Sequence, residues 1–173
     1  MEQLKNYIRE IPNFPKPGIL FYDISTLLKN PKALRMTIDR FVWLFSEQSV
    51  DKVVGIESRG FIFAPIVAYS LNAGFVPVRK PGKLPGRTVG QSYDLEYRSD
   101  RVEMHEDAVE SGERVLIVDD LLATGGTAGA TAELVTSQGG EVVGLGFVVE
   151  LLFLKGRAKL SKYALQSLIV YED

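Results

Sequence analysis

The chain has 173 residues, of which 46% are hydrophobic and 24% charged, and its formal net charge is −2, an ordinary composition for one globular domain over residues 1–173. So small a charge creates no field that would attract nucleic acid, and the absence of cysteine excludes disulfide frameworks, thiol catalysis and cysteine-ligated zinc. The first residues carry charges where a signal peptide needs an apolar core, and the most apolar stretch, residues 142–154, is interrupted by Glu150 and too short to span a membrane. We therefore expect a cytoplasmic protein with no nucleic-acid or membrane partner.

The N-terminal segment shows little regular periodicity. Leu4 and Ile8 share one face of a short helix predicted over residues 2–9. Three prolines and a glycine between residues 12 and 18 then favour a stiff, extended connector without regular structure. The apolar run at residues 19–28 has a mixed period, which is typical of irregular chain or of a short strand.

A capped helix and a buried strand come next. Asn30 and Pro31 predict a helix start, because the Asn side chain caps free N–H groups and proline fits the first helical position. Apolar residues at helical spacing continue this helix to about Glu47. Residues 52–56 are apolar and short, as in a buried strand, and they lead into the loop Glu57-Ser-Arg-Gly60.

The middle of the chain is less regular. A helix is predicted through residues 66–71, with Gly74 as its left-handed cap, and a strand over residues 75–79. Residues 80–100 contain prolines, glycines and charges without a clear period, and a connection this long is usually functional or disordered. Residues 101–105 alternate like an exposed strand and would complete a hairpin-like excursion.

The last third of the chain alternates strands and helices. The β-branched run that begins at Val115 indicates a strand buried on both faces, and a helix should start near Thr127 and end at the glycine pair 139–140. Further strands are predicted over residues 141–149 and 166–171, separated by a short helix or loop. This order predicts a doubly wound α/β fold with a largely parallel sheet of about five strands.

Two adjacent carboxylates, Asp119 and Asp120, precede the short loop between the central strand and its helix. Open α/β sheets bind ligands at this edge, and the helix N-terminus beyond the loop favours a phosphate. Carboxylates would repel a bare phosphate but accept hydrogen bonds from sugar hydroxyls, so a phosphorylated sugar fits both features. The alternative is a tight strand-to-helix turn with two solvated aspartates.

A wider resemblance favours the ligand site over the turn. The stretch Val115 to Thr127 resembles the 5-phosphoribosyl-1-pyrophosphate (PRPP) signature of type I phosphoribosyltransferases. Within that family the chain is similar to the adenine phosphoribosyltransferases from Pro15 to Tyr171. The motifs that carry this similarity occur in the family's order and are Glu57-Ser-Arg-Gly60, Arg79-Lys-Pro-Gly-Lys-Leu-Pro-Gly86, Tyr93-Asp-Leu-Glu-Tyr97, Val149-Glu-Leu151 and Lys155-Gly-Arg157.

The resemblance implies a type I phosphoribosyltransferase fold with a small N-terminal hood at residues 1–30 and a flexible lid loop at residues 80–100. It assigns catalytic roles to Asp119 and Asp120, which would hold the ribose hydroxyls, and to Glu96, the candidate acid/base on the lid. It further assigns PRPP binding to Ser58, Arg59, Gly60, Arg79, Lys80, Lys83, Tyr97, Ala123, Thr124, Gly125, Gly126 and Thr127. In the family, the loop that contains Ser58 often holds a non-proline cis peptide.

On the base side, the resemblance implies that Phe21 stacks on the purine, with Leu20, Tyr22, Glu150 and Leu151 around it. From the sequence alone, Phe21 is equally well explained by core packing, and Glu150 by a solvated strand end. Tyr22 departs from the family, which usually has Arg or Lys before the Asp, so base affinity or proton handling could differ here.

The implied reaction converts adenine and PRPP to AMP and pyrophosphate in purine salvage. Mg²⁺ would be bound through the substrate, with no metal site from protein side chains expected, and the family is usually dimeric, which implies a homodimer. Two rivals remain: a xanthine or hypoxanthine-guanine phosphoribosyltransferase, and a non-catalytic PRPP-sensing regulator. The regulator is disfavoured because such proteins usually add a nucleic-acid-binding domain, for which this chain has neither the length nor the basic charge.

Overall fold

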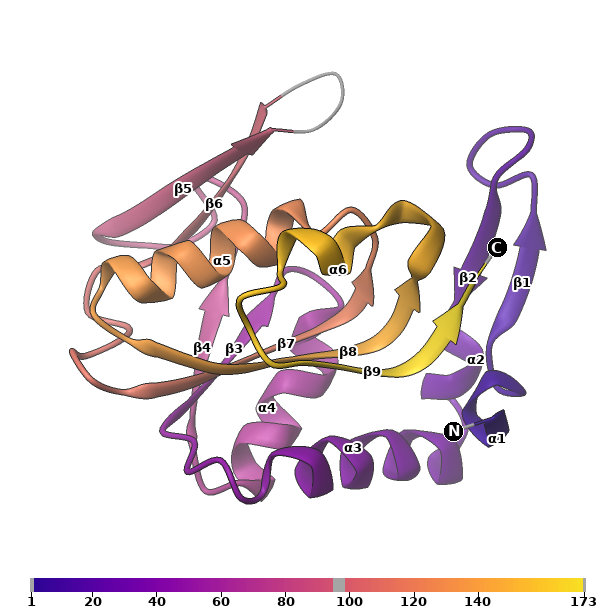
Figure 1. The fold of residues 1–173 in the computed structure, drawn as a ribbon, viewed down its shortest axis with the longest axis horizontal. Coiled ribbons are helices and arrows are strands. Elements are labelled where there is room, and N and C mark those ends of the chain that lie inside the picture. Colours follow the sequence, from indigo (N-terminus) through magenta and orange to yellow (C-terminus); the bar gives the residue numbers. More distant parts are fainter. Residues whose placement is uncertain (1, 95–98, 173) are drawn as a thin grey trace.

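The computed structural model describes residues 2–94 and 99–172, and its centre is a five-stranded sheet in the order β4-β3-β7-β8-β9 (Figure 1). Every neighbouring pair in this sheet is parallel. Its strands are β3 (Lys52–Ile56), β4 (Gly74–Val78), β7 (Arg114–Leu122), β8 (Glu141–Leu151) and β9 (Leu165–Tyr171). The predicted α/β fold with a parallel five-stranded sheet is confirmed.

Helices cover both faces of this sheet, and two antiparallel hairpins flank it. The helices are α1 (Glu2–Lys5), α2 (Ser25–Leu28), α3 (Pro31–Phe45), α4 (Gly60–Ser70), α5 (Gly126–Ser137) and α6 (Gly156–Lys159), with a 3₁₀ turn η1 (Leu152–Leu154). The hairpins pair β1 (Arg9–Pro12) with β2 (Leu20–Asp23), and β5 (Thr88–Asp94) with β6 (Ser99–His105). In Figure 1, α3 and α4 lie on one face of the sheet and α5 on the other.

The core is divided in two by the sheet, because successive side chains of a strand point to opposite faces. On β7, Leu116 and Val118 pack with α3 and α4, whereas Val115 and Ile117 pack with α5 and the β5–β6 hairpin. This two-sided burial explains why the strands read as continuous apolar runs. Within the part of the chain that is described, no helix is long and apolar enough to cross a membrane.

The amino ends of the strands are fastened by polar contacts around Arg114, the first residue of β7. Its backbone N–H donates to Asp51 Oδ2 at 2.8 Å, and its Nε donates to the carbonyl of Ser49 at 3.0 Å. Its Nη1 reaches both carboxylate oxygens of Glu141, which opens β8, at 3.0 Å. One arginine therefore joins the start of three neighbouring strands on the edge of the sheet opposite the carboxyl ends.

The predicted start of α3 is confirmed. Asn30 Oδ1 accepts from the backbone N–H groups of Lys32 and Ala33, at 3.1 and 3.0 Å, and Pro31 is the first helical residue. The predicted cap of α4 is wrong in its residue. Asn72, with φ 55°, takes the left-handed conformation, whereas Gly74 begins β4. An Asn side chain tolerates this conformation better than most residues do, so it ends the helix early.

Three segments without clear periodicity can now be assigned, and the run at residues 19–28 contains the short strand that was one of its two predicted alternatives. Residues 9–12 and 20–23 form the β1–β2 hairpin despite the prolines, because Pro12 is the last residue of its strand, and Pro15 and Pro17 lie in the loop, where no ladder donor is needed. Residues 88–94 form β5 within the segment predicted to be a loop. The partner strand β6 is not exposed as predicted, since Val102 and Met104 are buried under α5.

Candidate functional site

The predicted ligand residues converge at the carboxyl ends of β3, β4, β7 and β8. Because these strands are parallel, the loops that follow them leave the same edge of the sheet (Figure 1). Glu96 and Tyr97, predicted on the lid, lie outside the described residues, and their roles stay predictions. The remaining predicted residues can each be placed.

The loop between β7 and α5 forms a small cavity. Its volume is about 90 Å³, and its lining consists of Asp119 and residues 121–128. Gly125 caps α5 with a φ of 77°, a left-handed conformation that favours glycine. The first N–H groups of α5 have no acceptor within the helix and carry partial positive charge. The geometry is that of an anion cradle.

Asp119 and Asp120 stand at the rim of this cradle as an interacting pair. The backbone N–H of Asp120 donates to Asp119 Oδ1 at 2.8 Å. Burial raises the pKa of the Asp119 carboxyl well above its usual range, and the charge of Asp120 raises it further. Burial also raises the pKa of Asp120, although the Arg59 guanidinium opposes that rise. Two neighbouring carboxylates that are largely removed from water are stabilised in their charged form by a ligand that donates hydrogen bonds to them.

The loop after β3 brings a cation to the same point. Arg59 Nε lies 2.8 Å from Asp120 Oδ2, which is almost fully buried, and the Glu57–Ser58 peptide is cis, as the family resemblance implied. The hydroxyl-bearing Ser58 is exposed. A Cβ added to Gly60 would lie 2.9 Å from Asp119 Oδ1, so the start of α4 packs directly on the carboxylate pair. The loop and the pair form one unit.

The basic segment after β4 does not present all its cations to the open edge. Arg79 donates to both carboxylate oxygens of Glu57, at 3.3 and 3.0 Å, and to the carbonyl of Lys83. Glu57 also accepts from the backbone N–H of Lys80 at 3.0 Å. Hydrogen bonding to Arg79 holds the pKa of Glu57 below its usual range. Arg79 thus fastens the β4 loop to the β3 loop, while the side chain of Lys83 is exposed.

Lys80 is the predicted cation that faces the hairpin. Its Nζ donates to Tyr93 Oη at 3.0 Å and forms an ion pair with Asp100 Oδ2 at 2.5 Å. Burial would lower the pKa of Lys80, but the bonds to Asp100 and Tyr93 outweigh it and raise the pKa. Sequence reasoning missed Glu57 and Asp100 as partners of the two cations, because both pairings join segments more than 19 residues apart.

On the base side, Phe21 lies near the carboxylate pair. The guanidinium of Arg59 is 5.9 Å from the Phe21 ring centroid, and Phe14 meets Phe21 edge to face at 5.1 Å. Leu20 is 40% exposed. Tyr22 points to the other side of β2, where it is buried in the core and stacks on Tyr171 at 3.7 Å. Its place in the core explains how an aromatic residue can stand where the family usually has a cation.

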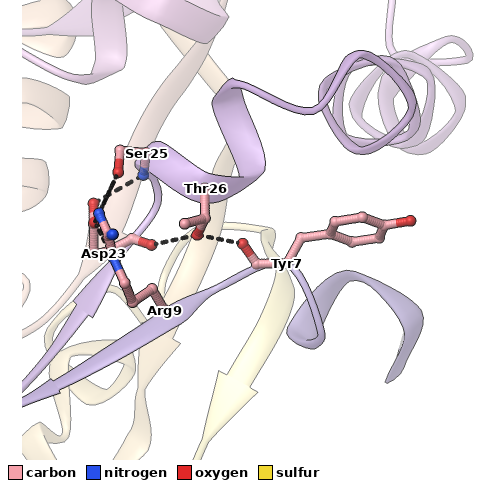
Figure 2. Close-up of polar contacts among 5 residues, drawn as sticks. All are labelled: Tyr7, Arg9, Asp23, Ser25 and Thr26. Atoms are coloured by element: carbon pink, nitrogen blue, oxygen red, sulfur yellow. Dashed lines mark hydrogen bonds and ion pairs between the residues drawn. The ribbon is translucent and has the colours of Figure 1, made fainter.

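A polar network lies at the base of the β1–β2 hairpin, the hairpin that carries Phe21 (Figure 2). Asp23, two residues further along the same face of β2, accepts from Arg9 Nε at 3.0 Å and from the hydroxyl and N–H of Ser25, at 2.7 and 2.9 Å. The Ser25 hydrogen bonds, with Arg9, lower the pKa of Asp23 to about 2. Thr26 donates to the carbonyl of Tyr7 at 2.6 Å. The network ties β1, β2 and α2 together.

Glu150 and Leu151 end β8 on the base side. Glu150 is only 1% exposed, and its carboxylate accepts two hydrogen bonds from Arg157 of α6, one of them from Nε at 2.9 Å. Glu150 is therefore not the solvated strand end that the sequence left open. Burial opposes its ionisation, but the Arg157 hydrogen bonds lower its pKa. Leu151 is buried beside it.

The base side and the phosphate loop touch through a pair of glycines. A Cβ added to Gly156, the first residue of α6, would lie 2.2 Å from the carbonyl oxygen of Ala123 and 2.9 Å from the N of Gly125. A Cβ on Gly125 would in turn lie 2.7 Å from the Gly156 carbonyl oxygen. Two backbones thus pack against each other without side chains between them. The motif around residues 155–157 signalled this segment, but not its contact with the loop.

This arrangement of a parallel sheet, a strand–loop–helix anion cradle and an acidic pair is the one expected of a phosphoribosyltransferase. The family defined by the phosphoribosyl transferase domain matches residues 23–169, and the chain belongs to this family.

Two similar proteins are adenine phosphoribosyltransferases. The adenine phosphoribosyltransferase of Solibacter usitatus is 60% identical over 172 residues, which cover 99% of each chain. The crystal structure of adenine phosphoribosyltransferase from Thermoanaerobacter pseudethanolicus is similar with a TM-score of 0.95 and 51% identity, over 98% of this chain and 99% of that one.

A second similar structure is a complex with ligands. The adenine phosphoribosyltransferase of Saccharomyces cerevisiae, complexed with D-2,5-dideoxy-2,5-imino-altritol 1,6-bisphosphate and adenine, has a TM-score of 0.90 and 44% identity, over 96% of this chain and 97% of that one.

Proposed function

We infer that the protein is an adenine phosphoribosyltransferase, which converts adenine and PRPP to AMP and pyrophosphate. The observation that carries this inference is the carboxylate pair at the rim of the phosphate cradle, on a chain whose relatives named for this activity align over nearly its full length. Purified protein with Mg²⁺, PRPP and adenine should release pyrophosphate and form AMP. Parallel assays with hypoxanthine, guanine and xanthine test the rival base preferences, and no turnover with any base would favour a regulator.

The residues fit the charge changes of the reaction. Loss of pyrophosphate from C1′ leaves oxocarbenium character on the ribose and collects negative charge on the leaving group. The cradle at residues 123–127 would hold the 5′-phosphate, and Asp119 and Asp120 would accept from the ribose hydroxyls. Ser58, Arg59, Gly60, Lys80 and Lys83 would serve the pyrophosphate, so that catalysis rests on positioning and electrostatic stabilisation.

Arg79 has a supporting part in this proposal. Its guanidinium is bound to Glu57 and to the carbonyl of Lys83, so it positions the two pyrophosphate loops relative to each other. Phe21, Leu20, Glu150 and Leu151 would border adenine. Tyr97 and the acid/base Glu96, on the lid, complete the prediction, and Glu96→Gln should lower turnover more than PRPP binding.

Mg²⁺ is proposed to enter with the substrate. Among residues 2–94 and 99–172, no cluster of three or more His, Cys, Asp or Glu side chains could hold a metal ion. The carboxylate of Asp120 is already paired with Arg59. Mg²⁺ keeps several waters and commonly binds through substrate phosphates, which suits a site of this kind. When bound, it would neutralise charge on the departing pyrophosphate.

Asp120→Asn tests the ribose role. The substitution removes the charge while keeping the size of the side chain, so the fold should persist. Turnover should fall by about 10²–10³-fold, the loss typical of one removed electrostatic contact. Steady-state kinetics with adenine as the fixed substrate measure this, and unchanged kinetics would remove Asp120 from the ribose site.

We propose a homodimer formed through α4. Ile62, Ile66 and Tyr69 lie on one face of this helix, and Tyr69 is 88% exposed. The opposite face is buried, so α4 is apolar all round, and such a helix is ordinarily covered on every side. A second copy of the chain would cover this stripe. Ile66→Glu should produce a monomer in analytical ultracentrifugation, and an unchanged sedimentation coefficient would exclude this face.

The cytoplasmic location also stays a proposal. It follows the expectation from the N-terminal sequence, and cell fractionation tests it.

A further inference from the structure

The Tyr93 hydroxyl, on β5, makes hydrogen bonds to three other residues. It lies 2.9 Å from Thr127 Oγ1, at the start of α5, and 3.0 Å from Lys80 Nζ, in the loop after β4. It also lies 3.2 Å from Asp100 Oδ2, on the partner strand β6. Lys80 and Thr127 belong to the two halves of the proposed PRPP site, so one phenol joins the pyrophosphate side to the 5′-phosphate side.

The directions of these bonds follow from counting protons. An ammonium group only donates hydrogen bonds, and an ionised carboxylate only accepts them. Hydrogen bonding to Lys80 holds the pKa of Asp100 below its usual range, so Asp100 is ionised near neutral pH. The single Tyr93 proton therefore goes to Asp100, and the two lone pairs of Tyr93 accept from Lys80 and Thr127. Every bonding position of the phenol oxygen is used.

This count has a consequence for the two ligand groups. The only hydroxyl proton of Thr127 is committed to Tyr93 and is not available to a phosphate at the same time. The 5′-phosphate is then left to the backbone N–H groups of the cradle, and the Thr127 side chain fastens the cradle to the hairpin. Lys80 uses two of its three N–H donors on Tyr93 and Asp100, which leaves one donor for a ligand.

We propose that Tyr93 is a PRPP-positioning residue: its hydroxyl fixes Lys80, on the pyrophosphate side, and Thr127, on the 5′-phosphate side, relative to each other. This rests on the proposed function, because PRPP is the ligand that spans both subsites. Adenine, on the Phe21 side, makes no use of the link. Loss of the Tyr93 hydroxyl should therefore weaken the binding of PRPP and leave the binding of adenine unchanged.

The test is Tyr93→Phe, which removes one oxygen atom and keeps the ring that packs beside the core. PRPP binding measured by calorimetry without adenine should weaken about 10- to 150-fold, the effect expected for lost hydrogen bonds to a charged group. KM for adenine should stay within about twofold. Tyr163→Phe, the same change on the connection between α6 and β9, should leave both values unchanged.

A second pair of variants examines the bond itself. Thr127→Val should weaken PRPP binding as Tyr93→Phe does, and Thr127→Ser, which keeps the hydroxyl, should weaken it clearly less than Thr127→Val. The double variant should then be little worse than either single one, since both remove the same bond. Fully additive losses would show that Tyr93 and Thr127 act independently and would overturn the proposal.

The outcomes are separable from failure of the proposed function. If wild-type protein binds PRPP but forms no AMP, the proposed function fails while the Tyr93 test still runs on binding alone. PRPP affinity that is unchanged or tighter in Tyr93→Phe overturns the proposal. Equal losses for PRPP and adenine, together with a lowered Tm, would indicate a merely structural role and would also overturn it.

Discussion

Replacing Gly156 by alanine should damage PRPP binding from outside the phosphate loop. The new Cβ would lie 2.2 Å from the Ala123 carbonyl oxygen, 2.9 Å from the N of Gly125 and 3.0 Å from Leu122 Cδ1. The φ of Gly156 is not in the left-handed region, so the alanine itself meets no backbone strain. The contact alone is the obstacle, and backbone atoms form most of it.

The magnitude follows from the overlap. A carbon normally approaches a carbonyl oxygen no closer than about 3.3 Å, the distance of weak C–H···O contacts, so the loop must move by roughly 1 Å. Overpacking of this kind costs about 1–3 kcal/mol of stability, or about 2–12 °C in Tm for a domain of this size. A 1 Å misplacement of a positioning group lowers kcat/KM by on the order of 10²-fold. We expect that loss for PRPP and a smaller one for adenine.

The assay combines steady-state kinetics, with each substrate varied in turn, and thermal melting. Gly129→Ala is the matched control, because that Cβ would meet only Leu160 Cδ2, at 3.8 Å, in the helix that follows the same loop. It should keep full activity and gain about 0.5–1 kcal/mol from helix propensity. Wild-type kcat/KM for PRPP in Gly156→Ala would refute the reasoning, as would a loss explained entirely by the unfolded fraction.

Two further predictions concern carboxylates. Asp119→Asn should raise Tm at pH 7 while lowering turnover, because the raised pKa of Asp119 means that its charge destabilises the folded state once pH exceeds the unfolded value of 3.8. Equal Tm values for Asp119→Asn and the wild type throughout pH 4 to 8 would contradict this. Asp23→Asn should lower Tm at neutral pH, and the deficit should shrink as pH falls from about 4 through about 2, because the wild-type carboxyl, with its pKa of about 2, becomes protonated over this range. A deficit independent of pH would show that charge is not the cause.

Local patterns in the sequence predicted the sheet and the phosphate loop. Buried parallel strands are continuous apolar runs rich in β-branched residues, so β3, β7 and β8 could be located from the sequence pattern. The pair Asn30-Pro31 predicted the start of α3, because Asn caps a helix and proline fits its first position. Asp119 and the cradle are contiguous in the chain. Features of this kind depend on neighbours in sequence, which a pattern can reveal.

The features that were missed depend on neighbours in space. The pairing of Arg79 with Glu57, and of Lys80 with Asp100, is set by which strands become adjacent. The strand β5 was obscured because Thr88 to Asp94 mixes small and polar residues, and only the pairing with β6 makes it a strand. The cap of α4 was assigned to Gly74 because glycine is the most frequent residue at left-handed helix caps. Asn can also adopt this conformation, and Asn72 does so here. Tyr22 was assigned to the base by resemblance, whereas its side chain packs on Tyr171.

The contacts of Arg114 have a practical consequence for changing this protein. They join strand beginnings on the edge of the sheet remote from the carboxylate pair, and Glu113 adds an ion pair with Lys52 at 3.4 Å on that same edge. The contacts that join the strand beginnings and the residues proposed to bind substrate therefore lie at opposite ends of the same strands. Residues at the Arg114 end can therefore be varied in a screen for thermal stability without changing the proposed substrate site. Residues at the carboxyl ends can be varied in a screen for a new base without changing the contacts of Arg114.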